Sequence, residues 1–157
     1  MEKEIKRVKD YMSKKVVKFS AEDSVFKVAK ILSKKNISGA PVVKKGKLIG
    51  IISESDIVKF MQMKLPSLSA GKPPFLSLIF ASLIRDHLRF KKELKRISRF
   101  KVENVMSKNV ITISPEETIL EAATKMAKHD VNRLPVVKNG KLIGIISRAD
   151  LIRALLE

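Results

Sequence analysis

The sequence contains no cysteine and no tryptophan, and it has only two histidines in 157 residues. Without cysteine the chain can form no disulfide, thiolate nucleophile or cysteine-ligated zinc site. The two histidines, His87 and His129, are too few for an ordinary histidine-rich metal site. Aromatic residues make up 5% of the chain, so few side chains could stack on nucleic-acid bases. These absences argue against enzymes with a cysteine nucleophile and against proteins with a cysteine- or histidine-rich metal site.

The chain also lacks a long hydrophobic segment. The longest nearly continuous apolar run, residues 75–84, is far shorter than the roughly 20 residues that a membrane-spanning helix needs. The first residues carry acidic side chains early and lack the apolar stretch of a signal peptide. With 45% hydrophobic residues and a mean hydropathy of −0.02, the chain can still bury a core. We therefore expect a cytoplasmic, globular protein with no transmembrane segment.

Acidic residues are scarce relative to basic ones. The chain has 16 Asp and Glu against 33 Lys and Arg, for a formal net charge of +17. The net charge is +7 over residues 8–60, +7 over residues 61–100 and only +2 over residues 102–154. A charge of this size favours attraction to polyanions, although it says nothing about the fold. Any surface for a polyanion is therefore expected in the first half or the middle of the chain.

The chain contains two copies of one segment. A shift of 94 residues aligns residues 8–60 with residues 102–154 without a gap, and 22 of these 53 positions are identical. The longest identical block, Gly46–Ser53, recurs as Gly140–Ser147. Because two copies are too few for a solenoid, we expect a pseudo-twofold pair in which each copy covers the apolar face of the other.

Each copy begins with the pattern of a short strand followed by a helix. Residues 16–19 and 110–113 are rich in β-branched residues bounded by polar ones, which predicts strands. Ser24 and Thr118 are good N-caps for the segments that follow them. Apolar residues in these segments recur at i, i+3, i+4 and i+7, as on the buried face of a helix.

Each copy continues with a hairpin and a second helix. Residues 44–47 and 138–141 predict turns between apolar runs, and the second turn contains Asn-Gly, a strong hairpin signal. The return strands, 48–52 and 142–146, are almost wholly apolar, as expected of strands buried on both faces. Each return strand leads directly into a predicted helix.

The segment between the copies, residues 61–100, matches neither of them. Half of all the prolines lie within residues 65–74, which predicts an irregular connection. In residues 75–100, apolar residues recur mostly at spacings of three or four, with basic residues between them. This pattern predicts a basic amphipathic helix. Its role could be packing in a dimer, binding of DNA or RNA, or lying on an anionic membrane surface.

The chain has no motif of a common catalytic site. A Ser–His–Asp set, paired histidine ligands, a Walker loop and Gly-x-Gly-x-x-Gly are all missing from the sequence. We expect His129 to be a solvated residue at a helix end, and His87 to lie on a helix surface or interface. We therefore expect that the protein is not an enzyme and that it binds no metal.

The segment Gly50–Asp56 is chemically more specific, and it recurs as Gly144–Asp150. In both, an apolar strand ends at a serine, and an aspartate follows three residues later. This is a capping pattern, in which the serine and the aspartate close the helix end reciprocally. It is also the pattern of a ligand site, because a helix N-terminus favours phosphate and an aspartate can accept hydrogen bonds from a ribose diol. The spacing alone leaves both interpretations open.

The block Pro-Val-Val-Lys-x-Gly-Lys-Leu-Ile-Gly-Ile-Ile-Ser-x-x-Asp, at residues 41–56 and 135–150, resembles the cystathionine-β-synthase (CBS) domain. Two copies resemble the tandem pair called a Bateman module. The resemblance covers repeat 1 at residues 8–60 and repeat 2 at residues 102–154, with the linker at residues 61–100 as a departure from the family pattern. It implies an α+β fold of two pseudo-twofold-related β-α-β-β-α repeats packed through their sheets, often assembled as a disc-shaped homodimer.

The resemblance also implies a function. The chain would be a non-catalytic regulatory module that binds an adenosine nucleotide, such as AMP, ADP, ATP or S-adenosylmethionine, in the clefts between the repeats. The nucleotide would be a regulatory ligand rather than a cofactor, and an unknown effector protein would respond to it. The alternative is a nucleic-acid-binding protein that uses the basic linker helix and the lysine-rich first repeat, which a steep fall of affinity with salt would favour.

The family's mode of binding implies particular residues. Asp56 and Asp150 would accept hydrogen bonds from ribose, while Ser53 and Ser147 would reach ribose or phosphate. Adenine usually lies against the residues before the proline of the opposite repeat, so the two sets are crossed. One cleft would combine Ser147, Ala149 and Asp150 with Ser20, Ile37, Ser38 and Gly39. The other would combine Ser53, Ser55 and Asp56 with Ser114, Val131, Asn132 and Arg133.

The two implied clefts differ in charge. Arg133 is cationic at the position where its counterpart, Gly39, has no side chain. We infer that the cleft with Arg133 favours a phosphorylated ligand, whereas the other could take a less charged adenosine. Alternatively, Arg133 could pair with Glu54 in a structural ion pair.

Overall fold

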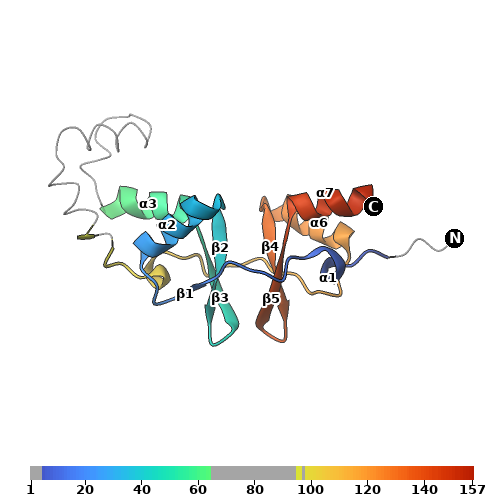
Figure 1. Cartoon of the computed structure of the whole chain (residues 1–157), viewed down its shortest axis with the longest axis horizontal. Coiled ribbons are helices and arrows are strands. Elements are labelled where there is room, and N and C mark those ends of the chain that lie inside the picture. Colours follow the sequence, from blue (N-terminus) through green and yellow to red (C-terminus); the bar gives the residue numbers. More distant parts are fainter. Residues whose placement is uncertain (1–4, 65–94, 97) are drawn as a thin grey trace. The chain divides into compact units, whose positions relative to one another are not determined.

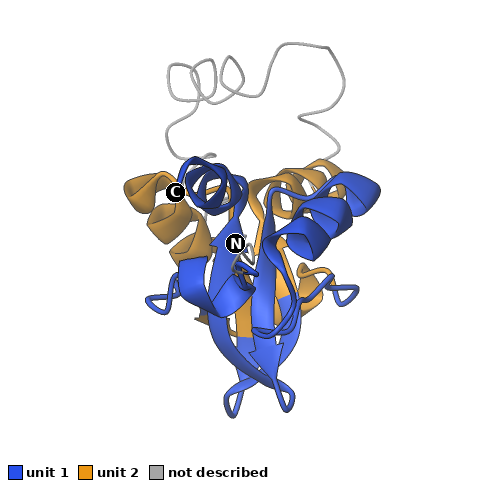
Figure 2. Cartoon of the chain, turned by 90° about the vertical axis from the view of Figure 1, so that its right-hand side faces the viewer, with its two compact units in different colours: residues 1–18, 43–50, 108–157 blue, residues 19–42, 51–107 orange. Residues whose placement is uncertain are grey.

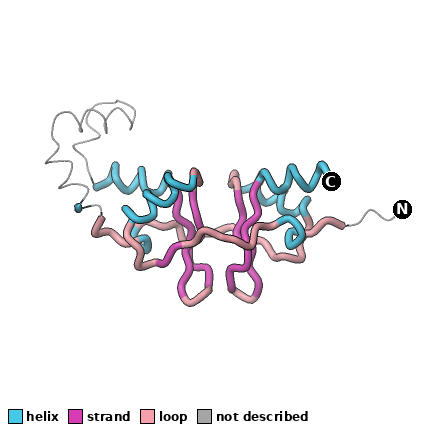
Figure 3. Tube along the Cα trace, in the orientation of Figure 1, coloured by secondary structure: helices cyan, strands magenta, loops and turns pink. Residues whose placement is uncertain are grey.

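The computed structural model describes residues 5–64, 95–96 and 98–157. The predicted irregular connection, most of the predicted basic helix and His87 lie outside these residues. The elements, shown in Figure 1 and by type in Figure 3, are α1 (Val8–Tyr11), β1 (Phe19–Ser20), α2 (Val25–Lys35), β2 (Gly39–Lys44), β3 (Lys47–Ser53), α3 (Glu54–Lys64), the 3-10 helix η2 (Val102–Asn104), α6 (Ile119–His129), β4 (Arg133–Lys138), β5 (Lys141–Ser147) and α7 (Arg148–Leu156).

Helices α2, α3, α6 and α7 begin where the sequence predicts. The side-chain oxygens of Ser24 and Thr118 each accept a hydrogen bond from the backbone N–H three residues later, at 3.1 and 3.2 Å. Helices α2 and α6 then end at Asn36 and Asp130, both in the left-handed conformation that terminates many helices. Helices α3 and α7 follow β3 and β5 directly.

Both hairpins are confirmed, and their turns are tight. In each turn the two central residues have positive φ: 50° and 77° at Lys45 and Gly46, and 52° and 75° at Asn139 and Gly140. Two successive left-handed residues are typical of the two-residue type I′ turn, whose twist matches that of the flanking strands.

The two predicted leading strands are the main disagreement with the sequence analysis. In place of a strand at 16–19, the structure has only the two-residue β1. In place of a strand at 110–113, it has a single parallel bridge between Ile113 and Val136. Residues 110–112 form no ladder, because a β-branched sequence becomes a strand only where a neighbouring strand offers hydrogen bonds.

The strands form one five-stranded sheet in the order β1-β2-β3-β5-β4. The two return strands, β3 and β5, are antiparallel neighbours, and Lys47 pairs with Lys141. Within the second hairpin the register runs from Arg133 opposite Ser147 to Lys138 opposite Lys141. A sheet of antiparallel hairpins, with helices that follow each strand pair, confirms the predicted α+β class.

The chain divides into two compact units that do not coincide with the two copies (Figure 2). Unit 1 consists of residues 1–18, 43–50 and 108–157, and unit 2 of residues 19–42 and 51–107. The opening residues of each copy therefore belong to the unit that contains most of the other copy. A contiguous repeat in the sequence is thus not a contiguous body in the structure.

The core of unit 1 includes a residue from the first copy. Val8 is fully buried, and its N–H donates to the Glu117 carbonyl at 2.9 Å. Ser13 and Ile145 exchange two backbone hydrogen bonds, at 2.8 and 3.0 Å. The buried cluster consists of Val8, Ile113, Ile119, Ala122, Met126, Leu134, Val136, Ile146, Leu151 and Ala154.

Unit 2 is built in the same way from the start of the second copy. Val102 is fully buried, and its N–H donates to the Asp23 carbonyl at 2.9 Å. Ile51 and Ser107 exchange two backbone hydrogen bonds, both at 2.9 Å. Its buried apolar residues include Val25, Val28, Leu32, Ala40, Val42, Ile52, Ile57, Phe60 and Val102.

Candidate functional site

The N-terminus of α3 is closed by a reciprocal capping box. Both the N–H and the hydroxyl of Ser53 donate to Oδ2 of Asp56, at 2.8 and 2.7 Å, and the Asp56 N–H donates to the Ser53 Oγ at 3.2 Å. Both residues are partly buried. Two hydrogen bonds to Oδ2 therefore hold the Asp56 carboxylate in one orientation, and the third closes the box from the Asp56 backbone. Among the described residues, no partner contacts its other oxygen, Oδ1.

The N-terminus of α7 repeats this box but adds an arginine. The Ser147 N–H and hydroxyl donate to Asp150 Oδ2 at 2.8 and 2.7 Å, and the Asp150 N–H donates to Ser147 Oγ at 3.4 Å. Arg153 also donates to Asp150 Oδ1 at 3.1 Å and to the carbonyl of Tyr11 at 3.0 Å. Both oxygens of Asp150 are therefore occupied.

The residues before each proline lie beside the helix N-terminus of the same copy. The carbonyl of Ser38 accepts from the Glu54 N–H at 2.9 Å, and the carbonyl of Asn132 accepts from the Arg148 N–H at 3.0 Å. A Cβ at Gly39 would lie 3.0 Å from the Ile52 carbonyl oxygen and 3.3 Å from the Ser53 Cβ. These contacts within a copy were not predicted from the sequence.

The predicted site residues divide between the two units by copy. Unit 2 contains Ser20, Ile37, Ser38, Gly39, Ser53, Ser55 and Asp56, and unit 1 contains Ser114, Val131, Asn132, Arg133, Ser147, Ala149 and Asp150. Ile37 and Val131 are half-buried next to the strands that follow them, and Ser55 and Ala149 are exposed in the first turns of α3 and α7. The crossed combinations join residues of different units, and they stay a prediction.

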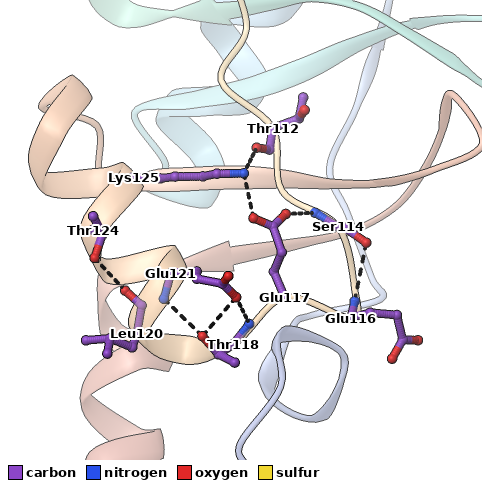
Figure 4. Close-up of polar contacts among 9 residues, drawn as sticks. All are labelled: Thr112, Ser114, Glu116, Glu117, Thr118, Leu120, Glu121, Thr124 and Lys125. Carbon is purple, nitrogen blue, oxygen red and sulfur yellow. Dashed lines mark hydrogen bonds and ion pairs between the residues drawn. The ribbon is translucent and has the colours of Figure 1, made fainter.

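Ser114 lies in a turn that Glu117 and Lys125 hold in place (Figure 4). Its N–H donates to Glu117 Oε2 at 2.7 Å, and its Oγ accepts from the Glu116 N–H at 3.4 Å. The ammonium of Lys125 pairs with Glu117 Oε1 at 2.8 Å and donates to the Thr112 carbonyl at 3.2 Å. Lys125, which the sequence analysis missed, therefore connects this turn to α6.

Ser20 occupies the matching turn of the first copy. Its N–H donates to Asp23 Oδ2 at 2.8 Å, and its Oγ accepts from the Glu22 N–H at 3.3 Å. Burial opposes the ionisation of Asp23, but the Lys27 ammonium and the Ser20 N–H outweigh this effect and hold the pKa of Asp23 below its ordinary value.

The serines of the site differ in their ability to donate to a ligand. The hydroxyl protons of Ser53 and Ser147 are already donated to aspartates. The hydroxyls of Ser20 and Ser114 accept a backbone hydrogen bond, and within the described chain they donate to no protein acceptor. Ser20 and Ser114 are therefore better suited than Ser53 and Ser147 to donate to a phosphate.

Neither a metal centre nor a membrane-spanning helix is present among the described residues. No group of three or more His, Asp or Glu side chains is arranged to hold a metal ion. None of the helices in this part of the chain has the length and apolar character required to cross a bilayer.

A comparison with protein families gives one match, the CBS domain, at residues 8–63 and 102–157. This match confirms the resemblance predicted from the repeated block at residues 41–56 and 135–150. An uncharacterized protein of Methanocaldococcus jannaschii, MJ1426, is 44% identical over 98% of this chain and 93% of its own length. A second protein of that organism, MJ0188, is 32% identical over 96% of this chain, which spans only 44% of MJ0188.

Solved structures show the same fold, and one of them was solved with ligands bound. The CBS domain pair of protein MJ0100, solved in complex with 5′-methylthioadenosine and S-adenosyl-L-methionine, is 29% identical to this chain. It aligns with a TM-score of 0.65 over 96% of both chains. The CBS domain of a membrane protein from Sphaerobacter thermophilus is 27% identical, with a TM-score of 0.71 over 95% of this chain and 87% of its own.

Proposed function

The chain belongs to the CBS domain family as a tandem pair of repeats, and from this premise we propose that it is a non-catalytic regulatory module that binds an adenosine nucleotide. The observation that carries the proposal is the Ser-x-x-Asp helix N-terminus, which occurs twice, each time beside a pre-proline backbone carbonyl. The adenosine ligands of the MJ0100 domain pair support the ligand class.

We assign the ribose to the aspartates. Asp56 is the more available of the two, because hydrogen bonds hold one of its oxygens and leave the other without a partner among the described residues. A carboxylate fixed in this way loses little conformational entropy when it accepts from a ribose diol. At Asp150 a diol has to share or displace Arg153. We therefore expect the Asp56 site to bind ribose more tightly.

The remaining residues of each set would bind the phosphate and the base. We propose that the hydroxyls of Ser114 and Ser20 and the cationic side chain of Arg133 donate hydrogen bonds to the phosphate. The half-buried Ile37 and Val131 would contact adenine. The crossed pairing implied by the family stays part of this proposal, and it makes the Asp56 set the one that prefers a phosphorylated ligand.

Ligand binding would regulate through a change in population. A nucleotide that binds one arrangement of the repeats more tightly than another shifts the equilibrium toward it. A partner copy or an effector protein would respond to that shift.

Isothermal titration calorimetry with AMP, ATP, S-adenosylmethionine and 5′-methylthioadenosine tests the proposal. The variant Asp56→Asn keeps an oxygen for the Ser53 N–H but removes the charge. Because a hydrogen bond to a charged group contributes about 1.5–3 kcal/mol, we expect its affinity to fall roughly 10- to 150-fold. Glu54→Gln is the matched control, since Glu54 is exposed in the same turn of α3.

Three results would count against the proposal. Failure of all four ligands to bind the wild-type protein would reduce both aspartates to helix caps. An equal loss in Glu54→Gln and Asp56→Asn would show that only local charge matters. An equal loss of AMP binding in Asp56→Asn and Asp150→Asn would contradict the asymmetry between the two sites.

A further inference from the structure

The tips of the two hairpins carry a group of lysines that the adenosine site does not use. We define the tip cluster as the five lysines of the turns and strand ends at residues 44–47 and 138–141: Lys44, Lys45, Lys47, Lys138 and Lys141. All five are exposed. Both hairpin tips belong to unit 1, where they project side by side (Figure 2).

Strand pairing brings three of these lysines onto one row. Lys138 lies opposite Lys141 across the second hairpin, and Lys141 lies opposite Lys47 across the β3–β5 junction. Residues directly opposite each other in antiparallel strands project from the same face of the sheet. Three ammonium groups therefore leave one face from adjacent strands.

Lys47 and Lys141, which face each other across β3 and β5, form the more closely spaced of the two kinds of antiparallel pair. The Leu48 N–H donates to the Gly140 carbonyl at 3.3 Å, and the Leu142 N–H donates to the Gly46 carbonyl at 3.2 Å. These bonds flank Lys47 and Lys141, which makes them a non-hydrogen-bonded pair, in which opposite Cα atoms approach to about 4.5 Å. Like charges directly opposite each other destabilise a sheet.

Ion pairs among the described residues do not relieve this repulsion. In the part of the chain that the structure describes, none of the five lysines forms an ion pair. The charge of Lys138 helps to lower the pKa of Glu116, but the stronger influence on that carboxylate is Lys9, which pairs with it at 2.9 Å. The tip cluster therefore lowers the stability of the sheet while it concentrates positive charge on an exposed edge.

We propose that the tip cluster binds the phosphate backbone of a nucleic acid. Phosphates spaced along a strand would neutralise the row formed by Lys47, Lys141 and Lys138, and released counterions would drive the association. The turn residues other than lysine are Gly46, Asn139 and Gly140. Because these offer no apolar side chain for insertion into lipid, an anionic membrane is the less suitable partner. Because contacts to phosphates carry no sequence information, we expect binding without sequence preference.

Fluorescence anisotropy with a labelled 20-base-pair DNA duplex, over a series of salt concentrations, tests this proposal on the full chain. Three contacts to duplex phosphates contribute a slope of about −2.7 in log K against log salt, or roughly a 40-fold loss of affinity between about 50 and 200 mM. The triple variant Lys47→Gln/Lys138→Gln/Lys141→Gln should lose this part of the slope. Its affinity for adenosine ligands should be unchanged, which separates this test from that of the proposed function.

The matched control is Lys30→Gln/Lys34→Gln/Lys128→Gln. It removes three exposed lysines from α2 and α6, so both triple variants have a formal net charge of +14 instead of +17. We expect the control to keep the wild-type slope. An equal loss in both triple variants would overturn the proposal, because binding would then depend on net charge alone. The absence of binding to DNA by the wild-type protein would also overturn it, as would cluster-dependent binding to vesicles containing phosphatidylserine but not to DNA.

Discussion

Replacing Val8 with alanine should destabilise the unit that contains most of the second copy, although Val8 lies at the start of the first. The side chain is fully buried in the cluster with Ile113, Ile119 and Met126. Removing two methyl groups costs about 1.6 kcal/mol in transfer free energy, and the cavity left behind raises the total to about 2–3 kcal/mol. The matched variant, Val102→Ala, removes an equally buried side chain from unit 2.

Native-state hydrogen exchange distinguishes the two units, because each amide reports the free energy of the opening that exposes it. In Val8→Ala, a loss of about 2–3 kcal/mol should accelerate exchange of the slowest α6 amides by roughly 30- to 150-fold, while α2 amides change less. In Val102→Ala, the order should be reversed. The reasoning would be refuted if Val8→Ala accelerated α2 as much as α6, since residues 8–18 would then stabilise their own copy.

Three further results are expected. Ser147→Ala removes the N-cap of α7, so the free energy of unfolding in urea should fall by about 1 kcal/mol; an unchanged value would show that the capping box contributes nothing. The backbone N–H and hydroxyl of Thr118 lower the pKa of Glu121, so this carboxylate stabilises the fold at neutral pH and ceases to do so as the pH falls below about 4.5; Glu121→Gln should therefore show a smaller loss of thermal stability between pH 6 and 3 than the wild-type protein. Lys45 has a φ of 50° in a type I′ turn, so Lys45→Asn should raise the free energy of unfolding by roughly 0.5 kcal/mol, and a decrease would contradict the turn assignment.

Much of the local structure was predictable from the sequence. The N-caps at Ser24 and Thr118, both hairpin turns and the capping boxes of α3 and α7 involve residues within about four positions of each other. Interactions over such short separations depend on side-chain chemistry and backbone preference, which the sequence states directly. The repeat and the family could also be predicted, because residues 41–56 and 135–150 carry the same signature.

The candidate site was only partly predictable. The spacing of Ser53 and Asp56 was compatible with both a cap and a ligand site. The structure shows that the cap exists, and that among the described residues its hydrogen bonds use only one oxygen of Asp56. Arg153 is three residues after Asp150, a spacing at which side chains on a helix meet, but its second contact, with the Tyr11 carbonyl, comes from a distant part of the chain. That contact could not be read from the helix alone.

By itself, the sequence determined the two copies, their hairpins and helices, and the chemistry of each Ser-x-x-Asp segment. Only the tertiary structure decided that residues 8–18 and 102–107 join the units containing most of the opposite copies, and that Lys47 faces Lys141. The physical reason is that each copy offers the same apolar surface and nearly the same strand edges, so local propensity does not distinguish the alternatives. The choice depends on which arrangement buries Val8 and Val102 and pairs their backbone groups. The Val8 N–H bonds to Glu117 and the Val102 N–H to Asp23, about 110 and 80 positions away in the sequence.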